Sequence, residues 1–221
     1  MRTLFKPLLF IVTTIAVSTI ANAQASNVSD LVKLYNENKL TVFNRDIATQ
    51  TDGSRNALIL SLQEGEGLVW LNDVSFSTGT IEIDLKGQDY FQHSFLGIAF
   101  HGEDEKTFEA IYFRPFRFHS SDPVDKSHSI QYISLPEYTW QKLREEKNGV
   151  YEKVLNDDPD PDNWFHAKIV VTATDVLVYV NDQTAPCLKA PLLCKNKTGK
   201  IALYTADQSG GTFANLVVQK D

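Results

Sequence analysis

Cysteine is scarce in this chain, and the motifs of several enzyme classes are missing. The sequence holds two cysteines, Cys187 and Cys194, and neither has a nearby histidine that would make a zinc site. A Gly-x-Ser-x-Gly elbow and a glycine-rich phosphate loop are both absent, so nothing supports an esterase or a nucleotide-binding protein. Beyond residue 23, no segment is long and apolar enough to cross a bilayer, which takes about 20 residues.

Positive charge is also in short supply. The chain has 21 lysine and arginine residues against 28 aspartate and glutamate residues, which gives a formal net charge of −7 at pH 7. An acidic surface repels the phosphates of nucleic acids and of anionic lipids. The composition therefore argues against a nucleic-acid partner and against docking on an anionic membrane.

The N-terminal segment has the pattern of a secretory signal peptide. Arg2 and Lys6 form a basic start, residues 8–20 are mostly apolar, and the Ala-Asn-Ala that ends at Ala23 supplies the small residues that signal peptidase requires. We predict cleavage after Ala23, export to the periplasm or the extracellular space, and one mature domain over residues 24–221. The alternative is an uncleaved membrane anchor, which the short and interrupted apolar core disfavours.

The two cysteines admit two interpretations in an exported chain. Cys187 and Cys194 would meet oxidising conditions, and the intervening Ala190-Pro191 suggests a turn that brings them together. We therefore expect a disulfide that closes a short loop. The alternative is a pair of buried thiols.

Short runs of apolar and β-branched residues, bounded by Gly, Asn, Asp and Pro, dominate the chain from residue 39 onward. The segment Thr80–Leu85 alternates apolar and polar side chains, as a half-buried antiparallel strand does. Apolar residues at helical spacing over residues 31–35 predict a short helix, which Ser29 or Asp30 would cap. The predicted strands are residues 39–43, 57–63, 67–71, 79–86, 94–101, 107–114, 127–135, 165–172, 176–181, 199–205 and 212–219.

Many strands without alternating helices predict an all-β protein, namely a two-sheet antiparallel jelly-roll sandwich in one domain. Residues 136–161 interrupt the rhythm of strands, with Trp140, Leu143 and Tyr151 among many charges. We expect a short helix and an ordered excursion there. Long excursions from a rigid sheet often carry function.

The catalytic motif of jelly-roll glucanases is incomplete. Those enzymes place three carboxylates on one strand face as Glu-x-Asp-x-(x)-Glu, and a retaining pair of carboxyl groups stands about 5 Å apart. The nearest match here is Glu82-Ile83-Asp84, and Lys86 and Gly87 occupy the place of the third carboxylate. A solvated strand face explains these residues better than a glucanase site does.

Five segments, taken in order, resemble a known family of secreted domains. They are residues 97–102 (GIAFHG), 112–116 (YFRPF), 129–132 (SIQY), 164–171 (WFHAKIVV) and 211–216 (GTFANL). The set resembles the concanavalin-like, laminin G-like jelly-roll domains of Bacteroidetes that are related to the 3-keto-disaccharide hydrolase family. The resemblance covers residues 40–219 and implies a curved front sheet that handles carbohydrate. Such domains are often described as glycoside hydrolases, mostly without a defined reaction.

The segment Glu109–Phe116 combines an arginine with aromatic residues. Alternation places Glu109 on one strand face and Tyr112, Arg114 and Phe116 on the other. A planar guanidinium donates paired hydrogen bonds to neighbouring sugar hydroxyls, and an aromatic ring stacks on the C–H face of a sugar. The alternative is a structural arginine paired with a carboxylate, with the aromatic residues in the core.

A second polar strand carries His128 on one face and Gln131 on the other. If this strand neighbours the Arg114 strand, Gln131 or His128 joins the same cleft, and histidine carries protons near neutral pH. A lone strand histidine is more often structural, and the same holds for His101 and His166.

The excursion supplies one more aromatic candidate. Trp140 is a stacking platform for a sugar if its ring is exposed beside the curved sheet. If the ring is buried, Trp140 instead anchors the loop.

A run of carboxylates lies at residues 157–162. Clustered carboxylates suit Ca²⁺, which takes 6–8 oxygen ligands. Two prolines make this run stiff, and its spacing matches no standard calcium loop. A solvated acidic turn is therefore the better interpretation, and we predict no required cofactor.

The leading functional hypothesis is an exported domain that binds an oligosaccharide or polysaccharide on its curved sheet. If Glu109 and Gln131 lie on the opposite face from Arg114, the predicted contacts cannot all be right. Two alternatives stay open, a hydrolase or lyase of a modified (3-keto) disaccharide and a non-catalytic envelope interaction domain, which would show a flat apolar patch. The predicted ligand contacts are Arg114, Phe116, Glu109, Gln131, His128 and Trp140.

Overall fold

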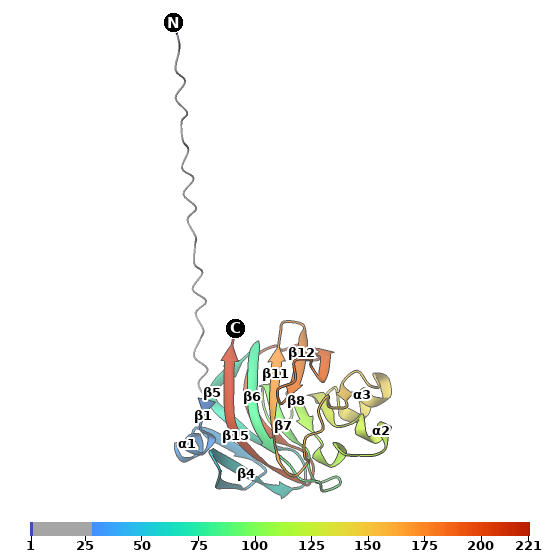
Figure 1. Cartoon of the computed structure of the whole chain (residues 1–221). Helices are drawn as coiled ribbons and strands as arrows, with labels where there is room; N and C mark the ends of the chain where they lie inside the picture. The colour runs from blue at the N-terminus through green and yellow to red at the C-terminus, as the bar shows by residue number, and fades with distance from the viewer. Residues whose placement is uncertain (2–27) are drawn as a thin grey trace.

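Two antiparallel β-sheets packed face to face make up the protein (Figure 1). The structure is a computed structural model that describes residue 1 and residues 28–221. The predicted signal peptide over residues 1–23 lies outside the described residues, apart from Met1. The predicted all-β sandwich is confirmed.

The first sheet, which we call sheet A, has the strand order β13-β12-β11-β6-β15-β4-β3, and β1 pairs with β15. Neighbouring strands in it are antiparallel throughout. Its strands are β1 Val28–Ser29, β3 Ile47–Asp52, β4 Arg55–Gln63, β6 Gly79–Lys86, β11 Trp164–Val171, β12 Asp175–Val180, β13 Leu188–Pro191 and β15 Ser209–Lys220.

The second sheet, sheet B, has the order β10-β9-β8-β7-β14-β5-β2. Strands β14 and β7 are neighbours although about 100 residues separate them in the chain, as a jelly roll requires. The strands are β2 Leu40–Phe43, β5 Gly67–Phe76, β7 Leu96–Gly102, β8 Phe108–Phe113, β9 Ile130–Leu135, β10 Glu152–Lys153 and β14 Gly199–Thr205.

The core between the sheets follows the alternation of the sequence. In β6 the side chains of Ile81, Ile83 and Leu85 are fully buried, whereas Thr80 and Glu82 are only partly buried on the outer face. An apolar side chain gains about 1.5–3 kcal/mol when it is fully buried. The repeated pattern therefore fixes which face of each strand turns inward.

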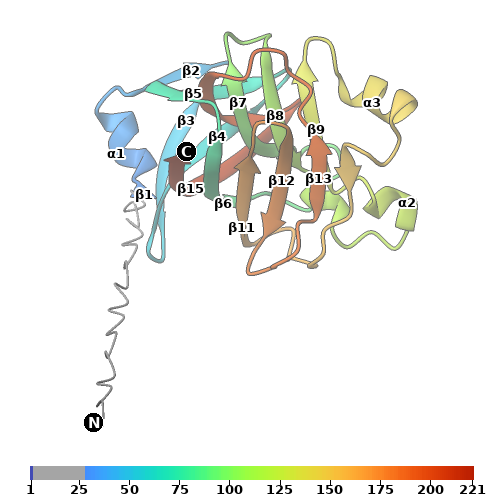
Figure 2. The ribbon, with the colours of Figure 1, turned by 90° about the horizontal axis from the view of Figure 1, so that it is seen from above.

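Sheet B departs from this simple pattern because its central strands are buried on both faces. Every residue of β7 and β8 is buried. Their inner faces face sheet A, and the outer face of β8 forms part of the floor of a cleft. Helix α3 (Trp140–Glu146) supplies part of its wall, and α2 (Pro123–Lys126) lies at the same end of the molecule (Figure 2).

Capping residues explain where the helices begin. Helix α1 (Leu31–Asn36) is capped by Asp30, which accepts a hydrogen bond from the Lys33 N–H, as predicted. Asp122 caps α2 and a proline occupies its first turn, so the predicted strand over residues 127–135 begins only at Ile130. Among the described residues, no helix is long and apolar enough to cross a membrane.

The strands that the sequence analysis missed are edge or very short strands. Strand β3 exposes four of its six residues, and β1 and β10 hold two residues each. Edge strands carry few buried apolar residues, so they lack the alternation on which the prediction rests.

The expected disulfide is not formed, and this prediction is wrong. Both cysteines are free thiols; Cys187 is buried and its Sγ lies 3.3 Å from the Val178 carbonyl oxygen. The residues between Cys187 and Cys194 form strand β13 instead of a turn. An extended strand advances about 3.3 Å per residue, which holds the two thiols apart.

A buried polar network connects the strands of sheet B. Glu109 is fully buried on the inner face of β8 and accepts hydrogen bonds from His101 on β7 and from the Tyr132 hydroxyl on β9. The backbone N–H of Cys194 also donates to Glu109, and that of Leu193 donates to the Tyr132 hydroxyl. One carboxylate thus joins three strands to the segment that leaves sheet A.

We predict that Glu109→Ala lowers the free energy of unfolding by about 3–5 kcal/mol, because it leaves several buried donors without an acceptor. Urea unfolding followed by tryptophan fluorescence measures the change. Tyr132→Phe is the control, since it removes one hydroxyl and should cost about 1–2 kcal/mol. Equal losses in the two variants would show that the carboxylate is not the centre of the network.

Candidate functional site

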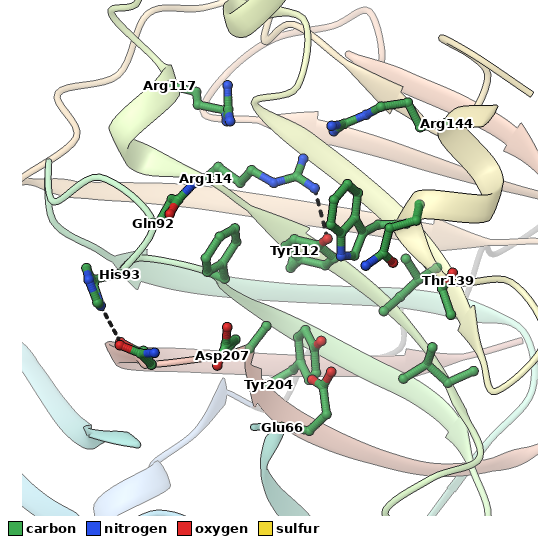
Figure 3. Close-up of a pocket in the computed structure, with 17 residues that line it drawn as sticks. Glu66, Gln92, His93, Tyr112, Arg114, Arg117, Thr139, Arg144, Tyr204 and Asp207 are labelled. Atoms are coloured by element: carbon green, nitrogen blue, oxygen red, sulfur yellow. Dashed lines mark hydrogen bonds between the residues drawn. The ribbon is translucent and has the colours of Figure 1, made fainter. Parts of the chain in front are cut away.

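A cleft of about 530 Å³ opens on the outer face of sheet B (Figure 3). Strands β8, β9 and β14 form its floor. The start of α3, the loop between β6 and β7, and the turn between β14 and β15 form its walls. The residues that line it are Glu66, Gln92, His93, Phe95, Tyr112, Arg114, Arg117, Ile133, Leu135, Thr139, Trp140, Gln141, Arg144, Tyr204, Ala206, Asp207 and Gln208.

Two tyrosines form the floor because a glycine lies between them. Tyr112 on β8 and Tyr204 on β14 are both cross-strand partners of Gly97 on β7. A Cβ atom at Gly97 would collide with the Ile111 carbonyl oxygen, so only glycine allows this close strand pairing. The two rings lie 5.8 Å apart between centroids and are tilted by 56° to each other, so the floor is aromatic but not flat.

Arg114 follows β8 and lies over this floor. Its side chain is only 4% exposed, and its guanidinium carbon lies 4.9 Å from the centre of the Tyr112 ring. Its guanidinium donates to the His128 carbonyl oxygen, the Tyr112 hydroxyl and the Gln131 side-chain oxygen, at 2.6, 2.9 and 3.3 Å. Neutral acceptors from three positions therefore hold the guanidinium in place.

Gln131 and His128 lie behind Arg114. Gln131 is fully buried, and its amide nitrogen donates to the carbonyl oxygens of Tyr132 and Tyr151. The His128 ring lies 2.8 Å from the Glu152 carboxylate without hydrogen-bond geometry, and burial lowers its pKa. Both residues support Arg114 from beneath the cleft and do not line it.

Helix α3 carries Trp140 and Arg144 into the cleft wall. Thr139 caps the helix by accepting from the Lys142 N–H. Trp140 is 40% exposed and lies 4.9 Å from the Arg144 guanidinium, which binds Glu152 through hydrogen bonds of 2.7 and 2.9 Å. Burial alone would raise the pKa of Glu152, but the bonds from Arg144 outweigh burial and lower it. Trp140 thus offers an open ring on a fixed helix.

Opposite the arginines, the cleft carries two carboxylates. Figure 3 shows Glu66 and Asp207 near Tyr204, and Arg114, Arg117 and Arg144 across from them. Burial raises the pKa of Glu66, although Tyr204 and Arg45 act against the shift. One oxygen of Glu66 is buried without a hydrogen-bond partner among the described residues, as is the Arg117 Nε.

Two of the predicted contact residues lie elsewhere. Glu109 is on the inner face of β8, fully buried in the network with His101 and Tyr132, so it does not line the cleft. Phe116 is 8% exposed and packs against Phe91 and Phe95, which leaves Phe91 as the exposed ring at that edge. Neither residue lines the cleft as the predicted contact, although Glu109 does lie on the strand face opposite Arg114.

The sequence analysis named only Arg114 and Trp140 among the lining residues, and five of those that it missed shape the chemistry of the cleft. Tyr112 was placed on the face of Arg114 by alternation but was not named as a contact. The others come from loops or from distant strands, and only strand pairing brings them to the cleft. The missed residues are Glu66, Tyr112, Arg117, Tyr204 and Asp207.

The carboxylates of the incomplete glucanase motif lie on the outer face of sheet A. Asp84 accepts hydrogen bonds from Arg55 and Asn215 and contacts His166, and Glu82 lies 3.2 Å from the same histidine. Burial alone would raise the pKa of Asp84, but these hydrogen bonds lower it to about 2. The cluster is internally paired, and it is therefore more ordered than the solvated strand face expected from the sequence.

Three carboxylates of the acidic run at residues 157–162 bind other groups of the protein. Asp157 accepts from Asn181, Asp158 pairs with Lys126 at 2.7 Å, and Asp162 accepts from the Asp89 N–H. Across residues 28–221, no group of three or more histidine, cysteine, aspartate or glutamate side chains is arranged to hold a metal ion.

The fold matches several solved structures. The carbohydrate-binding module CBM66 from Bacillus subtilis gives a TM-score of 0.57 at 16% identity, over 80% of this chain and 93% of that chain. A Bacillus subtilis protein of unknown function with a galectin-like fold gives 0.56 at 11% identity, over 89% and 98%. The potassium-bound carbohydrate recognition domain of Emp46p gives 0.51 at 14% identity, over 89% and 96%. At these identities the likeness shows a shared jelly-roll fold.

No family model matches the chain, and no curated protein matches it in sequence. The resemblance stated from the sequence is thus confirmed as a galectin-like jelly-roll sandwich. The narrower relation to the 3-keto-disaccharide hydrolase family has no support beyond that fold.

The pairing of His166 predicts a pH-dependent contribution to stability. Hydrogen bonding to Asp84, and secondarily to Glu82, raises the pKa of His166 above its ordinary value near 6.5. A raised folded-state pKa stabilises the fold below about pH 6.5, and this contribution is lost as the pH rises through the folded pKa.

We therefore expect the difference in free energy of unfolding between wild type and His166→Gln to shrink by up to about 1 kcal/mol between pH 5.5 and 8.5. Urea titrations at several pH values measure it. His119→Gln, at an exposed histidine without an ion pair, should show no such trend. A difference that grows with pH would contradict the assignment.

Proposed function

We propose that this protein binds a glycan in the cleft on the outer face of sheet B. The observation that carries the proposal is Arg114, a nearly buried guanidinium braced by neutral acceptors above an aromatic floor. Sugar sites combine such fixed hydrogen-bond donors with aromatic rings that stack on the sugar. The exposed Trp140 ring supplies a stacking surface at the edge of the same cleft.

The similar structures support this assignment. Two of them are named as a carbohydrate-binding module and as a carbohydrate recognition domain. A walled polar cleft is what an oligosaccharide or polysaccharide site requires, whereas a protein-interaction domain would show a flat apolar patch. The signal-peptide pattern of residues 1–23 fits a glycan ligand, since it would place the protein in the periplasm or outside the cell.

We predict that Arg114→Ala weakens glycan binding by about 100-fold, because hydrogen bonds from a charged donor contribute about 1.5–3 kcal/mol each. Trp140→Ala should weaken binding by about tenfold, since an aromatic contact contributes about 0.5–1.5 kcal/mol. A thermal-shift screen of the purified protein against oligosaccharides finds the ligand, and isothermal titration calorimetry measures the affinities.

The matched control is Lys168→Ala, which removes an exposed cation from the outer face of sheet A. Its affinity should equal that of the wild type. If no oligosaccharide binds, or if Lys168→Ala weakens binding as much as Arg114→Ala does, the cleft is not a glycan site.

A second candidate function is hydrolysis of the bound glycan. The observation that favours it is a partly buried carboxyl group, Glu66, in the wall of the cleft. Glycoside hydrolases use one protonated carboxyl group as an acid and a second carboxylate as base or nucleophile. Burial raises the pKa of Glu66, and Asp207 lines the same side of the cleft. These two groups would take the acid and base roles on a disaccharide, a 3-keto sugar included.

If the protein is a hydrolase, Glu66→Gln should abolish turnover of the bound glycan while changing its affinity less than tenfold. Mass spectrometry of the glycan after incubation measures the products. Asp207→Asn tests the second carboxylate in the same assay. A wild-type protein that binds a glycan and leaves it intact over days is a binding domain without this activity.

A further inference from the structure

Of the three arginines in the cleft, Arg114 is the one that forms no ion pair among the described residues. Arg144 is neutralised by Glu152, and Arg117 forms an ion pair with Asp125. Within residues 28–221, Arg114 has no carboxylate partner: its three hydrogen bonds all go to neutral acceptors. A guanidinium has five N–H donors, so the side chain keeps donor capacity for a ligand.

Burial makes this imbalance costly. Moving a charged group away from water is unfavourable unless an opposite charge or a full set of hydrogen bonds compensates for it. Arg114 is 4% exposed, so little water remains to compensate for its charge. An anion that enters the cleft would supply the missing partner.

Arg117 adds a second unsatisfied donor next to the first. Its Nε is buried with no acceptor in the described part of the chain, while its guanidinium packs on Phe116 at 5.3 Å. Burial lowers the pKa of Arg117, and the positive charges of Arg114 and Arg144 lower it further. The three cations therefore lie near enough to repel one another, which makes their side of the cleft attractive to an anion.

The carboxylates across the cleft from the arginines would determine the orientation of a bound sugar. Asp207 would repel an anionic group, and the oxygens of Asp207 and Glu66 would accept hydrogen bonds from neutral hydroxyls. A sugar that carries one acidic group thus has a preferred orientation, with its anion at the arginines and its hydroxyls at Glu66 and Asp207.

We infer that the cleft selects an anionic sugar, one that bears a carboxylate or a sulfate, and holds that group between Arg114 and Arg117. This inference rests on the proposed glycan-binding function and names the class of its ligand. Arg114 keeps two of its five N–H donors, one on Nε and one on Nη1, for the oxygens of either group. The acidic surface of the rest of the protein then slows non-specific capture of other polyanions.

The test compares each acidic oligosaccharide with its neutral counterpart. Calorimetry on the purified protein measures the affinity for tri-galacturonate and tri-glucuronate, each against its methyl ester, and for sulfated galactan fragments against the desulfated form. We expect the acidic form of at least one pair to bind tenfold or more tightly. The pair that responds separates a carboxylate ligand from a sulfated one. Raising NaCl from 50 to 500 mM should reduce this preference.

Charge variants assign the preference to the arginines. Arg117→Gln should cut the ratio of acidic to neutral affinity to threefold or less. Arg114→Lys, which keeps the charge and loses the planar guanidinium with its bonds to Tyr112 and Gln131, should weaken binding of the acidic form at least tenfold. Lys168→Gln is the matched control, because it removes the same charge from the opposite sheet and should leave the ratio unchanged.

Two outcomes would overturn the inference. If neutral glycans bind through Arg114 and Trp140 and no acidic form is preferred, the cleft is a neutral-sugar site and the proposed function stands alone. If neither acidic nor neutral glycans bind, the proposed function fails together with the inference.

Discussion

The buried carboxylate of Glu109 is the constraint on which sheet B depends. It accepts hydrogen bonds from β7, from β9 and from the segment that leaves sheet A, so Glu109 can lie only on the inner face of β8. Side chains alternate along a strand, and a shift of one residue would exchange the two faces. With Glu109 inside, Tyr112 and Arg114 must lie outside. The network in the core thus determines which residues form the cleft.

The same alternation explains which parts of the site can be predicted from the sequence. It predicts the three strands of the floor and the opposite faces of Glu109 and Arg114. The short helix expected in the excursion is also present, as α3. Gln131 also meets Arg114, because β9 does pair with β8. When both faces of a strand are buried, as in β8, alternation does not decide which face turns toward the core. Glu109 was therefore predicted as a ligand contact, although it lies in the core. A carboxylate looks like a ligand contact until its buried donors are known.

The remainder of the site depends on long-range pairing. Tyr204 reaches the floor because β14 inserts between β5 and β7, and Glu66 and Asp207 arrive on the turns that flank those strands. Nothing in the local sequence around these residues marks them. Strand β13 was missed for a related reason. Its four residues alternate in burial, but the Ala190-Pro191 at its end suggested a turn, and the disulfide prediction followed from that turn.

The two outer faces of the sandwich differ in how completely their charges are paired. On sheet A, His166, Asp84 and Arg55 pair with one another. On sheet B, the Arg117 Nε and one oxygen of Glu66 have no partner among the described residues, and Arg114 has only neutral ones. Folding alone does not explain polar groups that are buried and left unpaired, because each costs about 1–3 kcal/mol. A bound ligand that pairs with them would explain their presence, and this contrast is why we propose the site on sheet B.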